Sequence, residues 1–472
     1  MLTVGFAARC ITPSPGKEMP GLFERRFARG IHDDLFVRSV VIDDEVSCVA
    51  FVQVDAIVVP ETLVAAARRE AQRMCGIPGT NCFIAATHTH SGGPICSMLT
   101  TAEDPEYQNF VAQQIAASIS EAFRLRQSAF LGIESELAHG VAFNRRFLMR
   151  DGSQITHPGK MNPDALAPAG PEDPRVTVFS FFDPESWKPW GCIVNFACHA
   201  THVNGLYYSA DYVKWIVDTL KSVYGPEFGV VFLNGACGDV TQVDNRSPRP
   251  IEMGVHWAER SGRIVAGAAL QAIARATPYN DASIGLRRGV VRAALRKISP
   301  QALQEARKLL AKHPVTPRDV DTIFAKELLE VAKLRRKMSS RPLEIFAVRI
   351  ADAALWGVPG ELFQSFALTV RDQSPFLHTC CVELANGYNG YICTPEAFEG
   401  GGYEVLTART SMLEPTVGSA VVKMASRLLT DLFKQAKPEL EQLPQRRVWP
   451  TGDTSALEGL QQLASKNQPR NE

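Results

Sequence analysis

The sequence predicts an α/β protein, because short strand-like runs alternate with longer helical patterns along most of its 472 residues. The composition agrees with this class: hydrophobic residues make up 45% of the chain and charged residues 21%, as is usual for a globular domain. We find no internal repeat and no low-complexity linker that would interrupt the alternation.

The expected strands are short runs rich in apolar and β-branched residues. The chain begins with one over 1–6, and further strands are expected at 39–42, 48–52, 83–85, 192–196, 230–233 and 346–350. Helical patterns lie between these runs. The first helix opens with proline and has a glutamate in its first turn, both of which favour a helix start. The expected helices cover 60–73, 107–123, 210–224 and 251–273.

Two segments depart from the alternation. The segment 300–337 is strongly charged and has helical periodicity that Pro314 and Pro317 break. We expect a helical hairpin inserted on the surface, with a partner-binding arm as the alternative. The segment 439–472 is mostly polar, and we expect a tail that wraps the domain or is disordered. The expected organisation is one domain over 1–438 followed by this tail.

The composition also limits the class of function. Fifty basic residues balance fifty acidic residues, so nothing indicates binding to nucleic acid or to an anionic membrane. No apolar run is long enough for integral membrane association. The N-terminus lacks the basic and apolar regions of a secretory signal. The eleven cysteines are odd in number and form no Cys-x-x-Cys pair. These features predict reduced thiols in a cytoplasmic protein.

Two histidines follow the predicted strand at 83–85. His88 and His90 are separated by one residue, and residues i and i+2 of a strand point to the same face. We therefore expect the two imidazoles to leave the strand end side by side, which is a good start for a zinc site. A chance histidine pair is the alternative.

Two further candidate ligands follow predicted strands. His199 lies near the end of the strand at 192–196, although taken alone it is better interpreted as a core histidine. Glu361 follows a Pro-Gly turn, and we expect it to open a helix whose dipole favours its charge. Taken alone, an ordinary glutamate at a helix start is the simpler interpretation. Two imidazoles and one carboxylate with an open position form a recurring catalytic zinc set.

Small and aromatic residues gather in three other places. The turn 234–241 contains small residues that allow a ligand to approach the backbone, although a tight strand-to-helix turn would also need them. Gly/Tyr-rich loops occupy 386–391 and 400–404, where tyrosines either face a ligand or pack in the core. From these segments we take three candidate substrate-binding residues, Asp239, Thr241 and Tyr388.

These motifs together resemble the catalytic domain of the neutral/alkaline non-lysosomal ceramidase family. Any one of them is a weak signal, but they occur in the family's order along nearly the whole chain. They are Ala8-Arg9-Cys10-Ile11-Thr12-Pro13, Gly30-Ile31-His32-Asp33-Asp34, Thr87-His88-Thr89-His90-Ser91-Gly92, Phe143-Asn144-Arg145, Cys198-His199-Ala200-Thr201, Gly238-Asp239-Val240, Pro359-Gly360-Glu361 and the segment 386–396.

The resemblance implies mixed β-sheets flanked by helices, the ceramidase-like catalytic fold over 1–438, and one zinc ion per chain. The implied zinc ligands are His88, His199, Glu361 and Tyr391. The implied catalytic residues are His90 beside the attacking water, and Arg145 and Tyr403 in contact with the scissile group.

The chain departs from the family at several positions. Thr241 and Gln242 stand where ceramidases have serine and proline, and Arg146-Phe147 replaces Ser-Pro. The family's C-terminal immunoglobulin-like domain and secretory signal are not found in this sequence. We therefore expect a small-molecule or N-acyl substrate in the cytoplasm rather than ceramide in a membrane.

The predicted function is a zinc-dependent hydrolase that cleaves an amide (N-acyl) bond with water that the metal activates. His90 is expected to move the proton, while Arg145 and Tyr403 stabilise the oxyanion. One alternative is an esterase, lactonase or deacetylase acting on a small polar substrate. Another is a non-catalytic zinc protein, which the absence of cysteine ligands disfavours. Ser91-Gly92 after the histidine pair excludes the metallo-β-lactamase pattern. The acyl group, the amine and the oligomeric state stay open.

Overall fold

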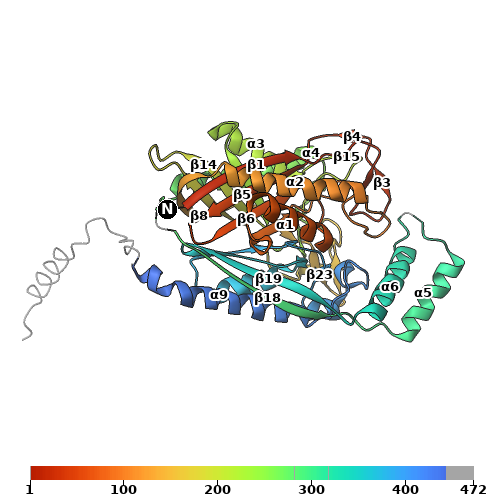
Figure 1. The fold of residues 1–472 in the computed structure, drawn as a ribbon. Helices are drawn as coiled ribbons and strands as arrows, with labels where there is room; N and C mark the ends of the chain where they lie inside the picture. The colour runs from red at the N-terminus through yellow and green to blue at the C-terminus, as the bar shows by residue number, and fades with distance from the viewer. Residues whose placement is uncertain (1, 281, 317, 443–472) are drawn as a thin grey trace, which may run out of the picture. The chain divides into compact units, whose positions relative to one another are not determined.

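The protein combines two main β-sheets and several smaller ones with flanking helices (Figure 1), which confirms the predicted α/β class. The computed structural model describes residues 2–280, 282–316 and 318–442. The chain up to Gln435 forms one compact unit. Most of the tail predicted over 439–472 lies outside the described residues, since the last helix is described as far as Gln442.

The larger sheet has eight strands in the order β16-β14-β13-β8-β1-β5-β6-β7. The pairs β14–β16 and β6–β7 are parallel and the other neighbours are antiparallel. The strands are β1 (Leu2–Cys10), β5 (Phe36–Asp43), β6 (Cys48–Val54), β7 (Cys82–Ala86), β8 (Gln127–Leu137), β13 (Arg175–Phe182), β14 (Pro189–Phe196) and β16 (Gly229–Asn234).

The second sheet has four strands in the order β18-β19-β20-β22, of which only β20 and β22 pair in parallel. These strands are β18 (Ile284–Ala294), β19 (Ser340–Ile350), β20 (Ala353–Gly357) and β22 (His378–Val382). Shorter strands lie within the segments that connect these elements. They are β2 (Glu18–Met19), β3 (Arg26–Phe27), β4 (Gly30–Ile31), β9 (Phe143–Asn144), β10 (Arg146–Met149), β11 (Gln154–Thr156), β12 (Ala165–Pro168), β15 (Tyr207–Tyr208), β17 (Val240–Thr241), β21 (Glu361–Leu362) and β23 (Tyr391–Ile392).

The helices agree with the predicted ones within a few residues at most ends. The predicted hairpin at 300–337 consists of two helices, as expected, whereas the long final helix was not predicted. The α-helices are α1 (Glu61–Cys75), α2 (Pro105–Arg124), α3 (Tyr212–Tyr224), α4 (Val255–Arg275), α5 (Pro300–Lys312), α6 (Val320–Lys337), α7 (Gln364–Gln373), α8 (Pro395–Gly400) and α9 (Val417–Gln442), with 3₁₀ turns at Gly79–Asn81 and Tyr403–Val405. No helix in the described ranges combines the length and apolar character needed to cross a membrane.

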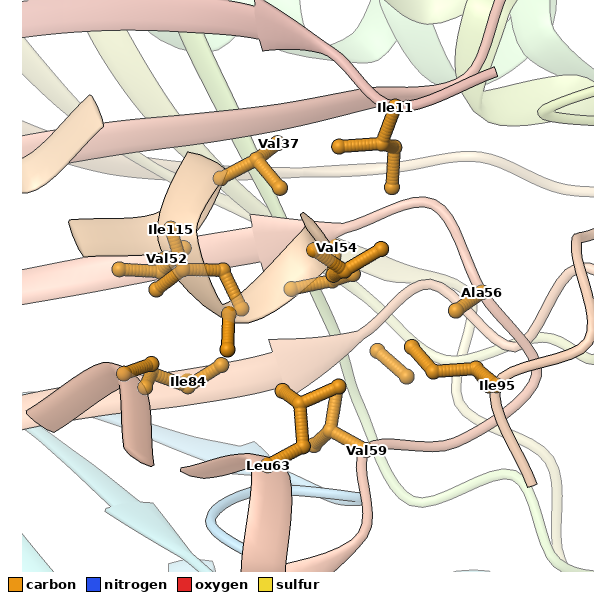
Figure 2. Packing of buried hydrophobic residues seen from close by; sticks show 14 of the residues in the cluster. Ile11, Val37, Val52, Val54, Ala56, Val59, Leu63, Ile84, Ile95 and Ile115 are labelled. Atoms are coloured by element: carbon orange, nitrogen blue, oxygen red, sulfur yellow. The ribbon is translucent and has the colours of Figure 1, made fainter. Parts of the chain in front are cut away.

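The side chains of the larger sheet alternate between two cores, as the two-residue period of a strand requires. Val41 and Val52 face the helices α1 and α2, in the cluster that Figure 2 shows. Val40 and Phe51, their neighbours in sequence, face the second sheet. Helices α3 and α4 cover another part of the helical face. Helix α9 runs along the second sheet (Figure 1), on the side away from the first.

The two sheets meet at a stack of aromatic rings. Phe83 of β7 lies with its ring centroid 5.4 Å from Phe51 of β6 and 4.2 Å from Phe346 of β19. All three side chains are buried. Burying a side chain of this size contributes about 1.5–3 kcal/mol, so this junction fixes the second sheet against the first. All eleven cysteines are free thiols, as predicted.

The larger sheet curls, so that β16 at one edge contacts β7 at the other. An isolated bridge joins Thr89, past the end of β7, to Ala200, past the end of β14. The residue after β22 completes the junction, because the backbone amide of Glu383 donates to the Asn234 carbonyl at 3.0 Å. The loops that carry the candidate residues therefore meet at one place.

Candidate functional site

The histidine pair leaves β7 through a turn. The strand ends at Ala86, and His88 has a left-handed backbone with φ 68°. Since a non-glycine residue seldom adopts this conformation, it indicates a functional or tightly constrained position. The rings of His88 and His90 lie with centroids 5.0 Å apart. The pair is therefore close, as predicted, but the turn rather than strand alternation brings it together.

His199 joins the pair from the loop after β14. Its ring centroid lies 4.4 Å from that of His88 and 6.0 Å from that of His90. One ligand nitrogen from each of these three residues lies within 4.8 Å of the others, a spacing that could hold a metal ion. The structure thus groups His90 with the two histidines that the sequence assigned to the metal.

Backbone carbonyls fix the orientation of all three rings. Each Nδ1 donates to a carbonyl oxygen, which leaves the lone pair on Nε2 as metal coordination requires. The acceptors are Ile57 for His88 at 2.8 Å, Gly21 for His90 at 3.0 Å, and Cys237 for His199 at 2.7 Å. The Nε2 atoms of His88 and His90 are buried and have no hydrogen-bond partner among the described residues.

Glu361 supplies a carboxylate to the same place. Its Oε2 lies 3.3 Å from Nε2 of His88 and 3.5 Å from Nε2 of His199, yet it has no hydrogen-bond partner among the described residues. Ligands at 2.0–2.2 Å in a tetrahedral zinc site stand about 3.4 Å from one another. Both distances from Glu361 Oε2 match that spacing, and the histidine nitrogens lie within 4.8 Å of one another, so the residues fit a zinc ion.

The sequence was wrong about the local structure at Glu361. This residue does not open a helix; it lies in the short strand β21, and α7 begins at Gln364. Strand β21 pairs with β23, which places Glu361 beside Tyr391 in parallel register. The close approach of another loop adds to this arrangement, because a Cβ on Gly238 would lie 2.6 Å from the Glu361 carbonyl oxygen.

Two tyrosines surround the carboxylate and the imidazoles. The hydroxyl of Tyr388 donates to Oε1 of Glu361 at 2.8 Å. The hydroxyl of Tyr391 accepts from Nη2 of Arg145 at 3.1 Å, and the Tyr391 ring lies 5.8 Å from that of Tyr403. Burial and the nearby Glu361 charge raise the pKa of Tyr391 well above its usual value, so its phenol is protonated in the metal-free protein.

Arg145 links these groups. Its guanidinium donates to the Gly238 carbonyl at 2.7 Å, lies 3.3 Å from Nε2 of His199 and forms an ion pair with Glu404 at 2.8 Å. Burial opposes the charge, but Tyr391 and Glu404 raise the pKa of Arg145 further above its usual value. Arg145 is therefore a fixed cation beside the candidate metal ligands.

The three histidines differ in the direction in which the protein shifts their pKa. Burial, with the charges of His88 and His199, holds the pKa of His90 well below 6.5. Burial and Arg145 lower the pKa of His199 to about 3. Although burial also disfavours the cation at His88, the Glu361 carboxylate raises the pKa of that imidazole. In turn His88 outweighs the burial of Glu361 and holds its pKa well below 4.5.

A cavity of about 720 Å³ opens onto this cluster. His90, Arg145, Tyr391 and Tyr403 form its inner end. Apolar side chains form part of its wall, and those with large exposed fractions are Ile251, Met253, Val320 and Leu406. Val320 belongs to α6, so the hairpin contributes to the cavity.

The candidate substrate-binding residues fall in two places. Thr241 lines the cavity, whereas Tyr388 contacts Glu361 and Asp239 holds two elements together. The carboxylate of Asp239 accepts from the Gln364 amide and from Asn144 Nδ2, both at 2.8 Å. Burial raises the pKa of Asp239 to about 6.

Sequence reasoning missed two buried carboxylates near the site. Glu404 binds both Arg145 and Arg146, and Glu383 accepts from the amides of Cys237 at 3.0 Å and Leu362 at 2.9 Å. A signal existed for Glu383, which is a charged residue at the end of the apolar run 380–382. Glu404 stands directly after Tyr403, but nothing in its sequence context indicates an ion pair.

His202, three residues after His199, has a structural role. It contacts Asp211 at 2.7 Å and Ser261 at 2.9 Å, which has the residue types of a hydrolase triad. All three side chains are buried, and none of them lines the cavity described above. This group ties the loop after β14 to the start of α3 and to α4.

The fold is that of the neutral ceramidases. A structure titled as a ceramidase complexed with C2 superposes with a TM-score of 0.70 at 18% identity, over 92% of this chain and 75% of that one. The neutral ceramidase from Pseudomonas aeruginosa gives 0.68 at 18% identity, over 96% of this chain and 77% of that one. No family model matches the sequence, and no curated protein matches it either. The predicted ceramidase-like fold is therefore confirmed by structure rather than by sequence similarity.

Proposed function

We propose that this protein is a zinc-dependent hydrolase that cleaves an amide (N-acyl) bond. One observation carries the proposal: Oε2 of Glu361 lies 3.3 Å from Nε2 of His88 and 3.5 Å from Nε2 of His199. These residues stand beside a cavity that is lined by the buried Arg145. Tyr391 is the proposed fourth ligand. A zinc ion held there supplies Lewis acidity and lowers the pKa of water toward ~7.

His90 is the proposed proton carrier. Its Nδ1 donates to the Gly21 carbonyl, so Nε2 is the atom that accepts a proton from the attacking water. Because the pKa of His90 lies well below 6.5, the imidazole is neutral near pH 7 and the imidazolium, once formed, is a strong acid. This favours return of the proton to the leaving amine.

Arg145 and Tyr403 are the proposed donors to the oxyanion. Both line the cavity, and ion pairing with Glu404 fixes the guanidinium. Burial and the Glu361 charge raise the pKa of Tyr403 above its usual value, so its hydroxyl keeps the proton that it donates. Donors held in place in this way stabilise developing charge more than mobile water does.

The lining of the cavity narrows the class of substrate that we expect. Its apolar wall favours an N-acyl compound whose acyl arm lies along Val320, Leu406, Ile251 and Met253. Each CH₂ buried there adds about 0.8 kcal/mol, which corresponds to about fourfold in kcat/KM. We expect kcat/KM to rise with acyl length and to level off when the wall is covered. A flat or falling series would instead favour the alternative of a small polar substrate.

The proposed function is tested by metal analysis together with amide and ester hydrolysis assays. His88→Ala and His199→Ala are expected to lose both zinc and activity. His90→Ala is expected to keep zinc while kcat falls by about 10²-fold or more. His139→Ala is the matched control, because His139 is exposed and is not among the residues that line the cavity.

Two results would contradict the assignment. Full zinc occupancy in His88→Ala and His199→Ala would remove these residues from the metal. Loss of zinc in His90→Ala would make His90 a ligand, which the grouping of the three imidazoles also permits. Hydrolysis of esters without hydrolysis of amides would favour the esterase alternative.

A further inference from the structure

The two helices of the hairpin at 300–337 are held very differently. Within α5, whose residues are all described, Ala306 is the only buried one. Helix α6 instead reaches two cores: Ile323 packs in the cluster that contains the buried faces of α1 and α2, and Val331 packs in the cluster of the second sheet. Because apolar side chains are buried at two places along it, α6 is a fixed part of the domain.

Hydrogen bonds also tie α6 to two loops that border the site. The buried carboxylate of Glu327 accepts from the backbone amide of Arg409 at 3.1 Å and from its guanidinium at 2.9 and 2.6 Å. Arg318, just before the helix, donates to Glu24 in the loop after β2 at 2.7 Å. The pair of Glu327 with Arg409 is buried and has several hydrogen bonds, so it fixes α6 against the segment that follows Tyr403.

One aromatic side chain of α6 reaches a proposed catalytic residue. The ring of Phe324 lies with its centroid 6.1 Å from that of Tyr403 and 6.0 Å from that of Phe23. The rings of Phe23 and Tyr403 are themselves 5.7 Å apart. The interplanar angles are 81°, 61° and 87°, so each pair has the edge-to-face arrangement that aromatic rings prefer.

The backbone around Tyr403 makes these ring contacts important. Gly401 and Gly402 precede it with φ 85° and 99°, conformations that glycine adopts without strain, and they bring no side chains that could hold the phenol. The Tyr403 amide donates to Thr156 Oγ1 at 3.2 Å, which fixes the main chain but not the direction of the side chain. Contacts of the ring, including one with Tyr391 at 5.8 Å, therefore decide where the hydroxyl lies.

We infer that Phe324 is a positioning residue for Tyr403, which holds the phenol where it can donate to the oxyanion without itself touching the substrate. Tyr403 lines the cavity, whereas Phe324 is not among the residues that line it. Phe324 instead lines a separate groove of about 410 Å³ between α5 and α6. The role of Tyr403 rests on the proposed function, but the dependence of its position on Phe324 does not.

Steady-state kinetics separate positioning from substrate contact. Phe324→Leu is expected to lower kcat by about 10-fold with KM nearly unchanged, because small displacements of a catalytic group cost rate and Phe324 does not line the cavity. Val320→Ala, in the same helix, removes a side chain that does line the cavity and is expected to raise KM instead. Phe324→Tyr keeps a ring and is expected to keep most of kcat. An unchanged kcat in Phe324→Leu, or an equal loss in Phe324→Tyr, would contradict the inference.

A double-mutant cycle tests whether Phe324 acts through Tyr403. Tyr403→Phe keeps the ring but removes the hydroxyl, and it is expected to lower kcat by about 10²-fold, the scale of a lost oxyanion donor. In that background Phe324→Leu is expected to change kcat by less than about 2-fold, since the hydroxyl that Phe324 positions is already absent. A further loss of about 10-fold in the double variant would mean that Phe324 acts independently of Tyr403 and would overturn the inference.

Zinc content and Tm are measured for every variant, so that general damage to the fold is recognised. Phe110→Leu is the matched control, because it removes a ring of α2 that lies 6.4 Å from that of Tyr107, and neither residue lines the cavity. If Phe324→Leu lowers Tm more than this control does, Phe324→Met, which keeps more of the volume, replaces it in all measurements.

The crystal structure of the Phe324→Leu variant gives a readout that does not depend on activity. The Tyr403 hydroxyl is expected to move by about 1 Å or more, a displacement large enough to affect catalysis. A hydroxyl in its wild-type position would overturn the inference. A displaced hydroxyl, together with a zinc-loaded wild type that hydrolyses no amide, would instead sustain the positioning and count against the proposed function.

Discussion

Replacing Tyr388 with phenylalanine separates two roles for this residue. The sequence suggested that Tyr388 binds substrate, whereas the structure shows its hydroxyl donating to Oε1 of Glu361 at 2.8 Å. A hydroxyl that holds a ligating carboxylate affects the metal first, because it fixes the carboxylate and balances its charge. We therefore expect Tyr388→Phe to weaken metal binding rather than substrate binding.

The magnitude follows from the kind of bond that is lost. A hydrogen bond to a charged group contributes about 1.5–3 kcal/mol, and about 1.4 kcal/mol corresponds to a tenfold change in affinity. Loss of outer contacts to metal ligands commonly costs about 10–100-fold in affinity. The expected result for Tyr388→Phe is thus a zinc Kd that rises by about 10- to 100-fold, with Glu361 itself intact.

The assay is competition for zinc against a chelator of known affinity. Tyr208→Phe is the matched control, since it removes a hydroxyl that donates to the Lys17 carbonyl at 3.3 Å instead of to a ligand. At saturating zinc, KM is then measured for both variants. An unchanged zinc Kd with a raised KM in Tyr388→Phe would refute our reasoning and restore the role in substrate binding.

Two further predictions concern residues beside the ligands. Gly238→Ala is expected to displace Glu361 and to lower zinc content, because its Cβ would stand 2.6 Å from the Glu361 carbonyl oxygen. In the control Gly267→Ala, the new Cβ meets no atom within 4 Å. Equal zinc content in both variants would contradict this prediction. Burial raises the pKa of Glu383 to about 8, from 4.5. The stability that the protonated Glu383 contributes is therefore fully present below about pH 4.5 and lost as pH rises through about 8. Thermal unfolding between about pH 6 and about pH 9 is expected to show a smaller fall in Tm for Glu383→Gln than for the wild type, and parallel curves would exclude this carboxyl as the cause.

Local patterns predicted the strands and the histidine sites, because each depends on residues close in sequence. The run 192–196 and His199 illustrate this, since an apolar strand followed by a polar residue is visible without the fold. The prediction that Glu361 opens a helix failed, because its conformation depends on pairing with Tyr391, which lies in a different loop. The ion pair of Arg145 with Glu404 was missed for the same reason.

The contact between Gln242 and Thr201 could not be predicted either. The sequence showed Gln242 only as a departure from a family pattern, and its meaning depends on Thr201, which approaches it from another loop. Sequence periodicity gives the face of a strand but not which loops meet beyond its end. The curl of the larger sheet, which brings β16 to β7, supplies that information.

The same curl has a consequence for biosynthesis. The hydrogen bond between Arg145 and Tyr391 joins residues 246 positions apart, and Glu361 reaches His88 from the second sheet's side of the chain. An emerging polypeptide cannot complete these contacts until most of it has left the ribosome, and contacts between distant positions form late because closing long loops is entropically costly. Capture of the proposed zinc ion would therefore follow maturation of the whole domain, and retention of the ion would report that the chain has finished folding.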